Sequence, residues 1–123
     1  MRLLLDTHVL LWWLADDPRL ASRHRELISL GENLVYVSSI SVAEISIKVS
    51  LGKLEAPAEI VDAVTAGGFE VLAFEARHAE RLRGLPWHHR DPFDRMLVAQ
   101  AQVEDLTLLS ADARVREYEV EVQ

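Results

Sequence analysis

The sequence contains no cysteine among its 123 residues, which excludes disulfides, thiolate zinc sites and a cysteine nucleophile. It also contains no apolar run near the roughly 20 residues needed to cross a bilayer. The longest candidate, VLLWWLA, is short and is followed directly by Asp16 and Asp17. Asp6 and His8 interrupt the apolar start of the chain, and no small-residue cleavage site follows, which argues against a signal peptide. These absences predict a cytoplasmic protein without a membrane segment.

Positive charge is scarce, with 13 lysines and arginines against 20 acidic residues and a net charge of −7. Nucleic-acid binders are usually basic, so this balance disfavours a simple binding module. It weighs less against a metal-dependent nuclease, whose acids would serve as metal ligands. The basic residues gather locally at 77–83 and 88–90, where they could meet a phosphate backbone or form a solvated helix face. The sequence has no glycine-rich phosphate loop, no HExxH and no GxSxG.

Apolar runs and helical patterns alternate along a chain whose length fits one domain, residues 1–123. Short strands are predicted at 2–6, 34–37, 69–74, 106–109 and 118–122. Helices are predicted at 8–15, 18–30, from the serines at 38–41 to about 52, at 57–67, 75–83 and 91–105. The runs LLL, LVYV and LTLL lack polar alternation, as buried parallel strands do. The pattern therefore predicts an α/β fold with a parallel sheet covered on both faces.

Four carboxylates fall where such a fold would bring them together. Asp6 and Asp112 follow apolar strands, while Glu44 and Asp94 lie near the starts of helices. Because the carboxyl ends of parallel strands share one edge, the four side chains would meet in one crevice. Like charges there repel and call for a hard divalent cation with oxygen ligands, Mg²⁺ or Mn²⁺. This arrangement predicts a site that cleaves phosphodiesters.

Taken singly, most of these acids also have a plain structural explanation. Asp6 and Asp112 could cap the segments that follow them, and Asp91, with Pro92 behind it, is a natural helix N-cap. Glu44 could form a surface i,i+4 pair with Lys48, worth about 0.3–0.5 kcal/mol. Asp94 is less easily explained in this way, because Asp91 already supplies the cap of its helix.

Histidines and tryptophans add little to this prediction. His88 and His89 could join the site, but an exposed loop pair is the favoured interpretation. Trp12 and Trp13 are interpreted as residues of the core or of a subunit interface. Two other classes built on acidic strand ends fit poorly. A phosphoacceptor receiver domain needs an acidic pair at its first strand and a lysine after its last, and a haloacid-dehalogenase-like phosphatase needs DxD, whereas the chain has DTH.

Three stretches carry a family resemblance: LLLDTHVLLWWL, VSSISVAEISIKVSLGKL and HHRDPFDRMLVAQAQVEDLTLLSADARV. Together they cover most of the chain, which resembles a PIN-domain ribonuclease, specifically the toxin of a VapBC-type toxin–antitoxin pair. The resemblance implies a three-layer α/β/α fold and Mg²⁺- or Mn²⁺-dependent endonucleolytic cleavage of RNA. It also implies a small basic antitoxin as partner, and a homodimer that assembles the groove one acidic chain lacks. The alternative is a degenerate PIN domain that only binds protein or RNA.

The resemblance also implies roles for individual residues. The acidic quartet is Asp6, Glu44, Asp94 and Asp112, of which the first and third match the positions most often assigned as metal ligands. Thr7 and Ser110 match small hydroxyl residues that support the site. Asp91 belongs to the DPFDR signature, with its part in metal binding left open. Arg95 and Lys48 are interpreted as phosphate contacts.

Overall fold

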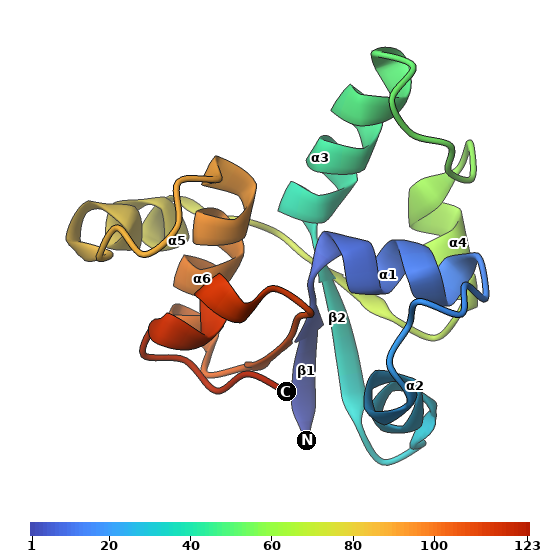
Figure 1. The fold of residues 1–123 in the computed structure, drawn as a ribbon, viewed down its shortest axis with the longest axis horizontal. Helices are drawn as coiled ribbons and strands as arrows, with labels where there is room; N and C mark the ends of the chain where they lie inside the picture. The colour runs from blue at the N-terminus through green and yellow to red at the C-terminus, as the bar shows by residue number, and fades with distance from the viewer.

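Four parallel strands form the centre of the computed structural model, which describes residues 1–123 (Figure 1). They are β1 (Arg2–Leu5), β2 (Leu34–Ser38), β3 (Glu70–Leu72) and β4 (Thr107–Leu109), in the spatial order β3-β2-β1-β4. The chain builds outward from β1 to β3 and then returns to place β4 on the other side of β1. The predicted parallel α/β sheet is therefore confirmed, with a change of winding direction beside the first strand.

Helices cover both faces of the sheet. They are α1 (Thr7–Leu14), α2 (Ser22–Ser29), α3 (Ser39–Ser50), α4 (Ile60–Ala66), α5 (Ala76–Arg81) and α6 (Pro92–Glu104), with short 3₁₀ helices η1 (Leu82–Gly84) and η2 (Ala113–Glu117). Figure 1 shows α5 and α6 on one side of the strands and α1, α2 and α4 on the other. None of the helices combines the length and the apolar character that a membrane span would need.

The two faces hold two separate hydrophobic clusters. Leu3 and Leu5 of β1 pack with α1, α2 and α4, whereas Leu4 packs with α6. Successive side chains of a strand point to opposite faces, so a strand buried on both faces must be apolar throughout. This explains the unbroken run LLL and gives the three layers that the resemblance implied.

Four predicted elements differ from the structure in their bounds. The helix expected from Pro18 begins only at Ser22, because Asp17 caps a separate turn by accepting the backbone N–H of Arg19 at 2.8 Å. The last strand, predicted at 118–122, is reduced to a single bridge between Leu108 and Val122. The helix expected from residue 57 also starts later, at Ile60, and the strand at 69–74 is shortened to β3.

Candidate active site

Asp6 and Ser110 lie side by side because their strands are neighbours in register. Leu5 of β1 pairs with Leu109 of β4, so the next residue of each strand emerges at the same edge. The Ser110 hydroxyl donates to Asp6 Oδ2 at 2.6 Å, and Asp6 Oδ1 accepts the backbone N–H of His8 at 3.3 Å. Burial raises the pKa of Asp6, and these two hydrogen bonds oppose the rise. Asp6 thus caps α1 and also lines the hollow, so its role as a helix cap does not exclude a role in the site.

Thr7 supports this edge in a different way from Ser110. Its hydroxyl donates to Ser41 Oγ at 2.9 Å, a buried contact between the first turns of α1 and α3. Ser38 caps α3 by accepting the backbone N–H of Ile40 at 3.0 Å. The hydroxyl residues therefore fix where α3 starts relative to α1, and with it the position of Glu44.

The first turn of α6 contributes two acids with different surroundings. Asp91 is the N-cap and accepts the backbone N–H groups of Phe93 at 2.9 Å and of Asp94 at 3.2 Å, as expected. Asp94 is thereby free of the capping role, and its carboxylate turns toward the strand edge. Burial and the nearby charges of Asp6 and Asp91 raise the pKa of Asp94 to about 7. The raised pKa shows that negative charge at this point is poorly neutralised by the protein alone.

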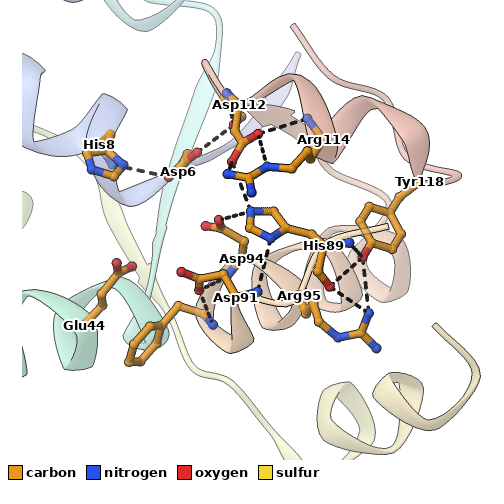
Figure 2. A network of polar contacts seen from close by, with 12 residues as sticks. Asp6, His8, Glu44, His89, Asp91, Asp94, Arg95, Asp112, Arg114 and Tyr118 are labelled. Carbon is orange, nitrogen blue, oxygen red and sulfur yellow. Dashed lines mark hydrogen bonds and ion pairs between the residues drawn. The ribbon is translucent and has the colours of Figure 1, made fainter. Parts of the chain in front are cut away.

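His89 lies at the acidic hollow, although the sequence favoured an exposed loop position for it. The expected exposed histidine pair holds only for His88, because His89 is buried. Its Nδ1 accepts the Asp91 backbone N–H at 3.1 Å, so Nε2 carries the proton. Nε2 lies 2.9 Å from Asp94 Oδ2 and 3.0 Å from Asp112 Oδ2, between the two acids (Figure 2). The only sequence signal was its place two residues before the α6 cap.

Asp112 is held more firmly than the other acids. It caps η2 by accepting the Arg114 backbone N–H at 2.9 Å, and the Arg114 guanidinium reaches both its oxygens. Burial alone would raise the pKa of Asp112, but the hydrogen bonds from Arg114 and His89 outweigh it and lower the pKa to about 2. Asp112 is therefore ionised while Asp94 is close to its titration point at neutral pH.

Glu44 is buried, in contrast to the surface pair that was the alternative explanation. Only 3% of Glu44 is exposed, and Lys48 Nζ contacts its Oε2 at 2.6 Å. Its other oxygen, Oε1, is buried without a hydrogen-bond partner. Figure 2 shows the carboxylate of Glu44 on α3 facing the acids of α6. Lys48 neutralises Glu44 and is thus not a free phosphate contact here.

Arg95, predicted as a phosphate contact, binds groups of the protein itself in this structure. Its guanidinium is buried and donates to the carbonyl oxygens of Pro86 at 2.7 Å and Leu85 at 3.2 Å. It also donates to the Tyr118 hydroxyl at 3.2 Å, and that hydroxyl accepts the backbone N–H of His89 at 2.9 Å. Because its hydrogen bonds hold the loop at 85–89 and the Tyr118 hydroxyl that binds His89, Arg95 fixes the loop that positions His89.

Three acids of the predicted quartet line a hollow of about 470 Å³ at the carboxyl ends of β1 and β4, whereas Glu44 is not part of its lining. Its lining includes Asp6, His89, Asp91, Asp94, Asp112 and Arg114. Carboxylate oxygens are the ligands that Mg²⁺ and Mn²⁺ prefer. The raised pKa of Asp94 indicates that the hollow suits added positive charge, whereas the unpartnered Glu44 oxygen lies outside its lining. The donor set fits a hard divalent cation, whereas His89, whose Nε2 proton faces two acids, does not fit as a ligand.

Comparison with known proteins agrees with this fold. The family model of the PIN domain matches residues 3–121, so the chain belongs to the PIN domain family. PIN domains are generally nucleases. No curated protein is similar enough in sequence to count as a match.

Solved structures share the fold at low sequence identity. VapBC2 from Rickettsia felis, bound to a DNA fragment from its promoter, matches with a TM-score of 0.73 and 16% identity, over 100% of this chain and 98% of that one. FitAcB from Neisseria gonorrhoeae matches with a TM-score of 0.66 and 21% identity, over 98% and 95%. DNA-bound VapBC from Salmonella typhimurium has a TM-score of 0.66 and 20% identity, over 100% and 97%.

Proposed function

We propose that this PIN domain is a Mg²⁺- or Mn²⁺-dependent endoribonuclease and the toxin of a VapBC-type pair. The observation that carries the proposal is the pair Asp6 and Asp94. They converge on one hollow, and neither carboxylate has a lysine or arginine partner. A protein that only binds partners has no need to hold such acids together against their repulsion.

Each acid is held in place by a different neighbour. Ser110 orients Asp6, and His89 orients Asp94 and Asp112 through its single Nε2 proton. Lys48 and Arg114 neutralise Glu44 and Asp112, which leaves Asp6 and Asp94 as the direct metal ligands. Glu44 and Asp112 would complete the donor set or orient water. A divalent cation bound there would lower the pKa of a water molecule and stabilise charge developing on the phosphodiester.

The decisive experiment is cleavage of a mixed RNA pool by purified protein in Mg²⁺, in Mn²⁺ and in EDTA. We expect cutting that requires metal and is lost in Asp6→Asn, which keeps the size of the side chain and an acceptor for Ser110. Glu26→Gln is the matched control, because Glu26 is an exposed acid on α2. Asp6→Asn that cuts at the wild-type rate would disprove the assignment. Wild type that binds RNA but never cuts would favour the binding-only alternative.

The structural neighbours also support a partner protein, because the VapBC and FitAcB structures carry the names of two-component assemblies. The net charge of −7 suits a small basic antitoxin. Co-expression with the product of an adjacent small gene should remove toxicity, and persistent toxicity would count against this pairing. Ile47, Val49 and Leu51, exposed near the end of α3, support a homodimer, to be checked by light scattering.

A further inference from the structure

A second hollow, of about 350 Å³, lies against the same first turn of α6 and is lined by arginine, tryptophan and apolar side chains. Its lining includes Arg83, Trp87, Arg90, Pro92, Arg95 and Met96, and no acidic residue. The acidic hollow is lined by Asp91 and Asp94, which alternate along the helix with Pro92 and Arg95 of the second. The two hollows therefore adjoin the same turn of the helix.

Trp87 is the most exposed large hydrophobic side chain of the protein, at 75%. Its indole is nonetheless held in place, because the Arg95 guanidinium lies 3.7 Å from the ring centroid. Arg95 is itself buried and fixed by the carbonyl oxygens of Leu85 and Pro86. One face of the indole thus rests on a rigid cation, and the rest of the ring is left in water. A flat aromatic surface fixed before binding loses little entropy when a second ring stacks on it.

The charge around Trp87 selects an anionic ligand. Arg83 and Arg90 are exposed and take part in none of the ion pairs of the protein. They form a locally positive surface on a chain whose net charge is −7. Two uncommitted arginines beside a free aromatic face match a single-stranded nucleic acid, whose phosphates pair with the cations and whose bases stack. A basic partner protein would be repelled from the same place.

We propose that Trp87, with Arg83 and Arg90, forms a stacking platform for an unpaired base of the RNA strand whose scissile phosphodiester lies at the acidic hollow. This inference rests on the proposed ribonuclease function and specifies how the substrate is held. Bases inside a duplex have both faces covered by their neighbours, so the platform requires an unstacked strand.

The platform is tested by binding, in EDTA, of a fluorescein-labelled pool of short single-stranded RNA, measured by anisotropy. Trp87→Ala should weaken binding by about five-fold to about 150-fold, the range for loss of one base–aromatic stack. Trp87→Phe should retain most of the affinity. Leu34→Ala is the control, because Leu34 is an exposed apolar residue at the opposite, amino end of the sheet. Thermal melts would verify that all variants are folded.

Two further measurements separate stacking from other roles. A ribose–phosphate strand without bases should bind wild type and Trp87→Ala equally, since it offers nothing to stack. Arg83→Gln and Arg90→Gln should each reduce the slope of log affinity against log salt by about 0.7, as expected for one phosphate contact on a single strand.

The outcomes distinguish this inference from the function on which it rests. Equal RNA binding by wild type and Trp87→Ala, in a protein that cleaves RNA, would overturn the platform alone. The platform alone would also be overturned if Trp87→Ala lowered affinity for the strand without bases as much as affinity for RNA. It would likewise be overturned if Trp87→Ala weakened binding of the partner protein and not of RNA. Wild type that neither binds nor cleaves RNA would overturn both proposals.

Discussion

Replacing Asp94 by asparagine should stabilise the metal-free protein at neutral and alkaline pH. The folded structure raises the pKa of Asp94 from 3.8 to about 7, chiefly by burial and then by the charges of Asp6 and Asp91. The unfolded chain therefore releases this proton at lower pH than the folded chain does. Since the folded state binds more protons in this window, stability falls as pH rises from about 4 to about 7 and is then constant. Asparagine keeps an acceptor for His89 and removes the charge.

The size of the effect follows from the shift. At about 1.36 kcal/mol per pKa unit, the full rise corresponds to about 4 kcal/mol. Asp94 lies at the mouth of a hollow open to water, which screens part of this energy, so we expect about 1–2 kcal/mol. For a domain of this size that gain raises Tm by about 4 to 8 °C in EDTA at pH 8, with a smaller gain at pH 5.

Differential scanning fluorimetry of wild type, Asp94→Asn and Glu26→Gln would measure this. Added Mn²⁺ should then reverse the order, because only wild type gains stability from the bound ion. The reasoning is refuted if Asp94→Asn is no more stable than wild type in EDTA at pH 8, or if its gain is as large at pH 5. Either result would mean that the acidic hollow is not under electrostatic strain without its ion.

Two other variants test how the site is held. His89→Ala removes the donor shared by Asp94 and Asp112 and should lower metal affinity or cleavage rate about 10- to 100-fold. Single-turnover cleavage measures this, with His88→Ala as the control. Equal rates for the two variants would exclude a role for the contacts of His89 with the two acids. Arg95→Ala leaves several carbonyl oxygens without their charged donor and should lower the free energy of unfolding by about 3 kcal/mol in urea titrations. Arg116→Ala, at an exposed position, should change the free energy of unfolding little. An equal decrease in Arg95→Ala and Arg116→Ala would show that the buried contacts of Arg95 contribute nothing.

The acids of the site were predictable, because strand ends and helix starts are local patterns. Asp6 follows LLL and Asp112 follows LTLLS, and the parallel arrangement brings their strands together without further information. The N-cap role of Asp91 was predictable for the same reason, since Pro92 marks the first residue of its helix. Each of these predictions depends only on neighbours in sequence and on the geometry of a parallel sheet.

His89 and Arg95 could not be assigned in this way. Whether a loop histidine is buried depends on Tyr118, which is 29 residues away and accepts its backbone N–H. Arg95 was expected to reach solvent, as arginines usually do. It is buried because the segment 85–89 bends and turns the carbonyl oxygens of Leu85 and Pro86 toward its guanidinium. The last strand fails for a related reason, since an alternating segment at the sheet edge has no second neighbour to extend its pairing. All three depend on contacts between distant segments.

The strand order has a consequence for when the site can exist. Asp6 is made 104 positions before its partner Ser110, which directly follows the last strand of the sheet to be made. A growing chain that has not yet released β4 from the ribosome lacks both Ser110 and Asp112, however well its earlier helices have formed. Whatever chemistry the acids perform is therefore withheld until residues 107–112 have been made and have entered the sheet.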